Sequence, residues 1–264
     1  MNILYIGDIM GEMGMAAVAK VLPGLRAEKG IDVVIAQSEN VSDGKGLRLV
    51  DYERLKVLGV DACAGGDHTV DKPEIFGLLQ NPDAPVVGPA NMPGCPGAGY
   101  KYLMLNGKRV LFVSLLGNVV GKHSEREIGN PLKTIDEILN SQRNVRRDAT
   151  IVNFHGDYSS EKVIIGYYLD GRVSVAVGDH WHVPTADAEV LPKGTAHMTD
   201  VGMCGSLDSS LGVTFDSVLP RWRDGLQTRN VLETAGRVQF NALLVCVDET
   251  TGRATAAEHI RQVW

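Results

Sequence analysis

Side chains that can bind metal ions follow several short apolar segments of this 264-residue sequence. Two of them, His180 and His182, are separated by a single residue and come shortly after the apolar run 173–177. Side chains alternate along a strand, so two histidines with this spacing are expected to point to the same side. The pair indicates a metal site if other segments supply further ligands.

Four earlier apolar segments also end in carboxylate, amide or imidazole groups, namely Asp8, Glu39 with Asn40, Asp67 with His68, and His155. Binding groups gather at the carboxyl ends of strands in α/β sheets, so these residues can converge although they span most of the chain. Carboxylates with several imidazoles favour borderline ions such as Mn²⁺, Fe²⁺ or Zn²⁺ over Ca²⁺ or Mg²⁺. Two such ions close together suit in-line displacement at phosphorus and lower the pKa of a bridging water.

The elements expected to position these groups alternate between strands and helices in the first part of the chain. A helix is predicted around Val18, Leu22 and Leu25, with Pro23 at a kink or break, and a second one from an N-cap at Asp51. Further on, Asn106-Gly107 marks a hairpin turn, residues 195–203 resemble a strand, and 215–222 a short helix. A closing hairpin over 238–260 is also predicted. These patterns predict a single α/β domain, residues 1–264, with mixed sheets.

Composition excludes several classes of function. The net charge of −6 argues against wrapping of nucleic acid, so no stable nucleic-acid complex is expected. No apolar run is long enough to cross a bilayer, and no membrane partner is expected. The four cysteines form no C-x-x-C pair and are interpreted as reduced thiols of a cytoplasmic protein. His123, His197 and His259 lie outside the ligand pattern and are interpreted as structural or exposed.

The order of these motifs resembles that of the calcineurin-like metallophosphoesterases: Gly7-Asp8, Glu39-Asn40, Gly66-Asp67-His68, His155 and Gly178-x-His180-x-His182. More narrowly, it resembles the bacterial YmdB-type branch, in which a Glu-Asn pair on the second strand replaces the usual Asp-x-His. Position 10 is Met10 rather than His, as in that branch. Further matching blocks lie at 44–47, 160–162, 192–196 and 199–203, so the similarity covers nearly the whole chain.

The resemblance implies a fold, a set of ligands and an activity. The fold would be an αββα sandwich of two mixed sheets flanked by helices. Two divalent ions, Fe or Mn ahead of Zn, would be bound by two overlapping sets of side chains: Asp8, Glu39, Asn40 and His182, and Glu39, Asp67, His155 and His180. Glu39 would bridge the ions, a metal-bridging hydroxide would attack phosphorus, and His68 would protonate the leaving alkoxide. The substrates would be small phosphodiesters, 2′,3′-cyclic nucleotides among them, and the protein would form a homo-oligomer.

The sequence departs from the family pattern at three motifs. Asp67 replaces the usual Asn, Gly156-Asp157 replaces Ala-Glu, and Asp179 and Trp181 flank His180 where Thr is usual. These changes are expected at the mouth of the site, with Trp181 pointing away from the two histidines.

Other assignments fit the sequence less well. A metallo-β-lactamase-like site would continue x-Asp-His after His182, where Val183-Pro184 stands, and a dehalogenase-type phosphatase would need Asp at position 10. The dinucleotide motif G-x-G-x-x-G is not met. The remaining rival is a metal-binding regulatory or scaffold protein of the same fold with little turnover, which the departures at positions 67, 157, 179 and 181 motivate.

Overall fold

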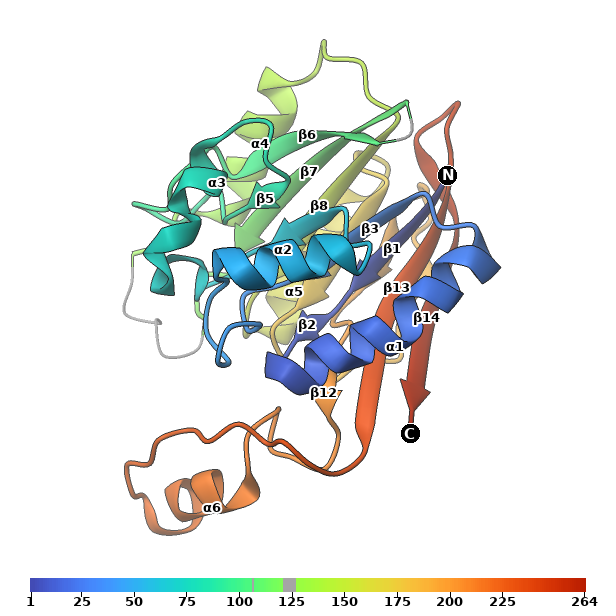
Figure 1. Cartoon of the computed structure of the whole chain (residues 1–264). Coiled ribbons are helices and arrows are strands. Elements are labelled where there is room, and N and C mark those ends of the chain that lie inside the picture. Colours follow the sequence, from blue (N-terminus) through green and yellow to red (C-terminus); the bar gives the residue numbers. More distant parts are fainter. Residues whose placement is uncertain (106, 121–126) are drawn as a thin grey trace.

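The computed structural model describes residues 1–105, 107–120 and 127–264. Two mixed β-sheets pack face to face, and helices cover their outer faces (Figure 1). This arrangement is the predicted αββα sandwich. In the described residues no helix is both long and apolar enough to span a bilayer.

The first sheet has the strand order β2-β12-β13-β1-β3-β4-β5, with β14 paired to β13. Strands β1, β3, β4 and β5 are parallel, whereas β13 runs antiparallel to β1. The strands are β1 (Asn2–Ile6), β2 (Asp8–Ile9), β3 (Val33–Gln37), β4 (Ala62–Ala64), β5 (Val86–Val87), β12 (Met203–Ser206), β13 (Val238–Asp248) and β14 (Arg253–Val263).

The second sheet has the order β10-β11-β9-β8-β7-β6. Its inner strands β7, β8, β9 and β11 are parallel, and β6 and β10 close its two edges in the antiparallel sense. The strands are β6 (Tyr100–Leu105), β7 (Lys108–Leu116), β8 (Ala149–His155), β9 (Val175–Asp179), β10 (Glu189–Val190) and β11 (Ala196–Met198). The carboxyl ends of β8 and β9 therefore lie at the same edge.

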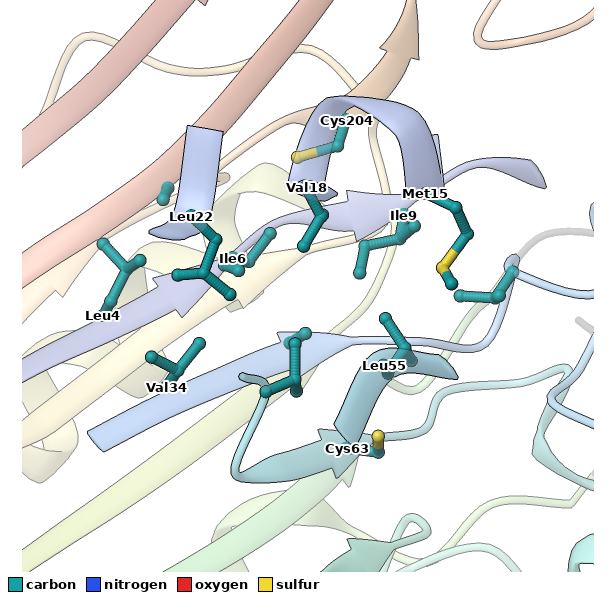
Figure 2. Packing of buried hydrophobic residues seen from close by; sticks show 14 of the residues in the cluster. Leu4, Ile6, Ile9, Met15, Val18, Leu22, Val34, Leu55, Cys63 and Cys204 are labelled. Carbon is teal, nitrogen blue, oxygen red and sulfur yellow. The ribbon is translucent and has the colours of Figure 1, made fainter. Parts of the chain in front are cut away.

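Three apolar clusters fill the spaces between the layers. One packs α1 and α2 on the outer face of the first sheet and includes Leu4, Val18 and Leu55 (Figure 2). A second lies between the two sheets and contains Tyr5 and Phe112. A third joins the second sheet to α4 and α5. The helices are α1 (Gly11–Lys29), α2 (Leu49–Val57), α3 (Phe76–Gln80), α4 (Pro131–Ser141), α5 (Ser159–Leu169) and α6 (Phe215–Asp224), with short 3₁₀ turns at Thr69–Asp71 and Pro73–Ile75.

Two helices differ from the predictions in detail: Pro23 does not break the first, and Asp51 does not cap the second. Helix α1 continues through Pro23 to Lys29. Pro23 lies on the exposed face, where water can satisfy the carbonyl that has lost its amide partner. Helix α2 begins at Leu49, so Asp51 is not its N-cap. Asp51 is buried instead, and its carboxylate accepts a hydrogen bond from the Ser42 hydroxyl at 2.6 Å.

The strand predicted over 195–203 is also wrong, because the chain changes sheets there. Strand β11 belongs to the second sheet and β12 to the first. The change of direction occurs at Gly202, which has a φ of +83° and no room for a side chain beside Pro184. The predicted hairpins form as β6–β7 and β13–β14. Asn106 and His123 lie outside the described residues.

Candidate metal centre

Five chain segments from both sheets bring the predicted ligands to one edge of the sandwich. Asp8 begins β2 directly after β1, Glu39 and Asn40 follow β3, and Asp67 follows β4. His155 ends β8, and His180 and His182 follow β9. Since β1, β3 and β4 are parallel, their carboxyl ends meet at the same edge, and β8 and β9 contribute from the facing sheet.

One ligand group combines Glu39, Asp67, His155 and His180, whose candidate donor atoms all lie within 4.8 Å of one another. Nε2 of His155 is 3.0 Å from Oε1 of Glu39 and 3.2 Å from Oδ1 of Asp67. The rings of His155 and His180 meet edge to face, with centroids 4.4 Å apart. Two carboxylates and two imidazoles at this spacing are a suitable donor set for a borderline divalent ion.

A second group lies beside the first and combines Asp8, Asn40 and His182. Nδ2 of Asn40 is 3.3 Å from Oδ1 of Asp8 and 3.3 Å from Nε2 of His182. Nδ1 of His182 lies 3.0 Å from the Leu211 carbonyl, which leaves Nε2 facing the group. The two groups are joined by the backbone, because the His180 amide donates to Oδ2 of Asp8 at 3.1 Å.

The environment of Glu39 fits a bound cation. Its side chain is buried, and Oε1 lies 3.0 Å from Nε2 of His155 but accepts no well-aligned hydrogen bond from any described residue. Oε2 accepts a hydrogen bond from the His68 amide at 3.0 Å. A side chain at Gly66 would come within 2.3 Å of Oε2, so only glycine allows the carboxylate this position. A buried carboxylate is costly unless a cation neutralises its charge, and a metal ion among these side chains would do so.

The carboxylates and imidazoles of the site shift one another's protonation. Burial alone would raise the pKa of Asp8, but His182, His155 and the His180 amide together outweigh it and lower that pKa well below its usual range. In the same way, burial lowers the pKa of His182, and the charge of Asp8 raises it above the ordinary value. The pKa of His155 is likewise raised despite burial, chiefly by Glu39. A divalent ion bound among these groups would neutralise the same carboxylates that raise the pKa of the imidazoles.

Asp179 orients His155 by contacting the ring nitrogen that faces away from the other candidate ligands. It is fully buried, and Oδ1 lies 2.7 Å from Nδ1 of His155. Its other oxygen accepts hydrogen bonds from Tyr5 at 2.5 Å, from Gln37 at 3.1 Å and from Asn153. The expectation that position 179 lies at the mouth of the site is therefore wrong. The sequence carried no signal for this role, because all four partners come from other strands.

A buried ion pair supports the segment that carries the two histidines. Nζ of Lys162 on α5 lies 2.7 Å from Oδ2 of Asp200, and both side chains are completely buried. The same Asp200 oxygen accepts the Trp181 amide at 2.9 Å, and Lys162 also donates to the Asp179 carbonyl. The pair thus holds the backbone on both sides of His180.

The alternation argument for His180 and His182 was wrong, although both residues reach the site. Strand β9 ends at Asp179, and His180 and His182 have φ values of +102° and +62°. Their side chains are placed by this irregular backbone and not by a strand pleat. Trp181 packs against Lys162, whose Nζ lies 4.4 Å from the ring centroid, and its indole N–H donates to the Asp157 carbonyl at 3.0 Å.

A cavity of about 500 Å³ opens above both ligand groups. His68 lies on its wall, with Nδ1 3.0 Å from Oδ2 of Asp71 and Nε2 4.0 Å from Oδ2 of Asp67. Opposite the ligands the wall includes Val218, Arg221 and Trp222 from α6. The sequence predicted helix α6 but not its place beside the site. That place depends on the loops that connect α6 to the first sheet (Figure 1).

The packed mixed sheets and the ligands at their shared edge define a calcineurin-like metallophosphoesterase. Residues 4–260 match the model of the family described as YmdB-like protein, and the chain belongs to this family. The protein is 36% identical over 262 residues to the 2′,3′-cyclic-nucleotide 2′-phosphodiesterase of Bacillus subtilis, with 98% of this chain and 96% of that protein covered.

Solved structures show the same relationship. A structure titled as a novel phosphatase, from Mycoplasma pneumoniae, is 30% identical and superposes with a TM-score of 0.91, covering 100% of this chain and 93% of that one. A structure of a hypothetical protein from Thermus thermophilus is 37% identical with a TM-score of 0.87, covering 100% and 99% of the two chains.

Proposed function

We propose that this protein is a metal-dependent phosphoric diester hydrolase that acts on small phosphodiesters, 2′,3′-cyclic nucleotides in particular. The observation that carries the proposal is the buried Glu39 carboxylate, which lies with Asp67, His155 and His180 in one group of candidate ligands and whose Oε1 makes no well-aligned hydrogen bond with any described residue. The activity printed for the Bacillus subtilis relative supports the substrate class. The cavity of about 500 Å³ is of a size that suits a single nucleotide.

Two ions would be held by side chains that the structure brings together. Glu39, Asp67, His155 and His180 would hold one, and Asp8, Asn40 and His182, with Glu39 as the bridge, would hold the other. Imidazole and carboxylate donors in this mixture favour Fe²⁺ or Mn²⁺, with Zn²⁺ as a further candidate. Because the ligands come from segments between residues 8 and 182, we also propose that residues 1–264 act as one catalytic domain.

Two bound divalent ions would supply an activated water and neutralise charge on the phosphoryl oxygens. The chain itself would supply orientation and a proton. Asp179 holds Nδ1 of His155, so that Nε2 faces Glu39 and Asp67. Leu211 does the same for His182 through its carbonyl. His68 stands beside the ligands on the cavity wall, oriented by Asp71, where an imidazole can protonate a poor alkoxide leaving group.

Hydrolysis of 2′,3′-cyclic AMP and bis-p-nitrophenyl phosphate with added Mn²⁺ tests the proposal. The wild-type protein is expected to turn over both substrates, and Glu39→Gln is expected to abolish turnover of both. Glu53→Gln is the matched control, because Glu53 is exposed on α2 and pairs with Lys56 outside the site. Tight metal binding without turnover on any phosphoester would instead support a regulatory or scaffold protein.

A further inference from the structure

A second cavity, of about 430 Å³, lies at the end of the sheets opposite the metal centre. Its lining includes Ala149 at the start of β8, Val173 before β9, and Gly252 in the turn between β13 and β14. This turn is at the end of the molecule away from α6 (Figure 1). The seven residues of β8 separate Ala149 from His155, a distance of about 20 Å, so the two cavities are distinct.

Five arginines surround this cavity: Arg143, Arg146, Arg147, Arg172 and Arg253. Arg172 is neutralised by Asp136 at 2.5 Å, whereas the other four form no ion pair within the part of the chain that the structure describes. Asp148 is the carboxylate in the lining, and its Oδ2 accepts the Arg109 amide at 2.7 Å. Positive charge is therefore concentrated here in a chain whose net charge is −6.

The fold orders the guanidinium of Arg147 and packs the stem of Arg253 against the backbone. Arg147 donates from Nε to the Thr150 hydroxyl at 2.8 Å and from Nη1 to the Gln142 carbonyl at 2.7 Å. The stem of Arg253 lies across Gly194, where an added Cβ would come within 3.0 Å of it. Cationic groups that are already ordered lose less conformational entropy when they bind a ligand.

We propose that this cavity binds a small anion that carries several phosphate charges, such as a nucleoside polyphosphate or inorganic polyphosphate. Guanidinium groups present paired donors that match phosphate oxygens, and they are always charged. The cavity volume falls within the range typical of small-ligand sites, and the acidic chain offers a nucleic-acid polymer little basic surface. The proposal does not depend on the phosphodiesterase function.

Isothermal titration of the full-length, metal-loaded protein with tripolyphosphate, ATP and AMP tests this site. Tripolyphosphate and ATP are expected to bind more tightly than AMP, and binding is expected to weaken with added salt. Arg253→Gln and Arg143→Gln should each weaken tripolyphosphate binding by about tenfold, as expected for the loss of one charge-assisted contact. Equal affinity for ATP and tripolyphosphate would show that the cavity contacts the phosphates alone. Tighter binding of ATP would show that it also contacts the nucleoside.

Arg237→Gln is the matched control, because Arg237 is exposed, is paired with Asp208 and lies outside the cavity. Arg143 and Arg253 are also exposed, so their substitution is expected to leave folding intact. Phosphodiesterase activity should be unchanged in both variants. The proposal is overturned if neither probe binds, or if Arg253→Gln and Arg143→Gln bind tripolyphosphate as the wild type does. It is also overturned if Arg237→Gln loses as much affinity, since that would indicate a general charge effect.

Discussion

Oδ1 of Asp179 lies 2.7 Å from Nδ1 of His155, and both side chains are fully buried. A carboxylate in this position fixes the imidazole so that its other nitrogen faces the ligand group. Asp179 also accepts hydrogen bonds from Tyr5, Gln37 and Asn153, so every neighbour that it contacts through its side chain is a donor.

Asp179→Asn is expected to weaken metal binding by about 10–100-fold, the usual range for loss of a partner behind a metal-bound histidine. An amide NH₂ would face a donor, whichever way the side chain is turned. Metal affinity measured by competition with a chelator checks this outcome. Asp170→Asn is the control, since Asp170 is also buried but accepts the Lys193 amide, away from the site. Equal metal loss in both variants would contradict a specific role of Asp179.

Lys162→Met is expected to destabilise the protein by about 3–5 kcal/mol, because Asp200 would be left buried without its cation. Burial already raises the pKa of Asp200, and Lys162 opposes that rise. Denaturant unfolding measures the loss. The double variant Lys162→Met/Asp200→Asn should recover part of the stability, whereas additive losses would show that the two residues act independently.

His68→Ala is expected to slow hydrolysis of 2′,3′-cyclic AMP by about 10²–10⁴-fold, and hydrolysis of bis-p-nitrophenyl phosphate much less. The alkoxide of the cyclic nucleotide needs a proton to leave, whereas nitrophenolate does not. Steady-state rates on the two substrates provide the comparison. Metal content should remain as in the wild type, and a large drop would make His68 a ligand. Equal losses on both substrates would remove it from the role of acid.

Asp67→Asn is expected to move the pH optimum of hydrolysis downward. Asp67, Asp8 and Glu39 would place three negative charges against the four positive charges of two divalent ions, and the amide would leave only two. A larger positive excess makes the activated water more acidic. A pH profile of kcat for the two proteins is the measurement. An unchanged profile together with an unchanged metal preference would refute this charge argument.

Stabilisation by Mn²⁺ is expected to grow with pH. Without metal, the pKa of His182 is raised in the folded protein, so its ion pair with Asp8 contributes to folding stability. This contribution is complete below the unfolded imidazole pKa of about 6.5, and it is lost as pH rises through the folded pKa. Metal binding requires neutral imidazole, so the stability that a bound metal adds increases as pH rises. The rise in Tm on adding Mn²⁺ should therefore be larger at about pH 8.5 than at about pH 6. Equal increments at both pH values would contradict this linkage.

Much of the fold, and the convergence of the candidate ligands at one sheet edge, could be predicted because each depends on local pattern. Buried parallel strands are short apolar runs, and the polar residue directly after each run marks the sheet edge, as with Asp8, Glu39 and His155. Predictions failed where a local rule met a tertiary constraint. The segment 195–203 has strand composition throughout, but it changes sheets at Gly202. His180 and His182 were placed by strand alternation, although the strand ends before them.

The sequence by itself determined which side chains are available to the candidate metal centre and the order in which strands present them. Only the tertiary structure decided what supports those side chains. Asp179 receives hydrogen bonds from residues between 24 and 174 positions away, and Lys162 meets Asp200 from a different element. Such partners are chosen by which buried polar groups must satisfy one another once the layers have packed. That requirement is a property of the whole fold, and no local pattern in the chain records it.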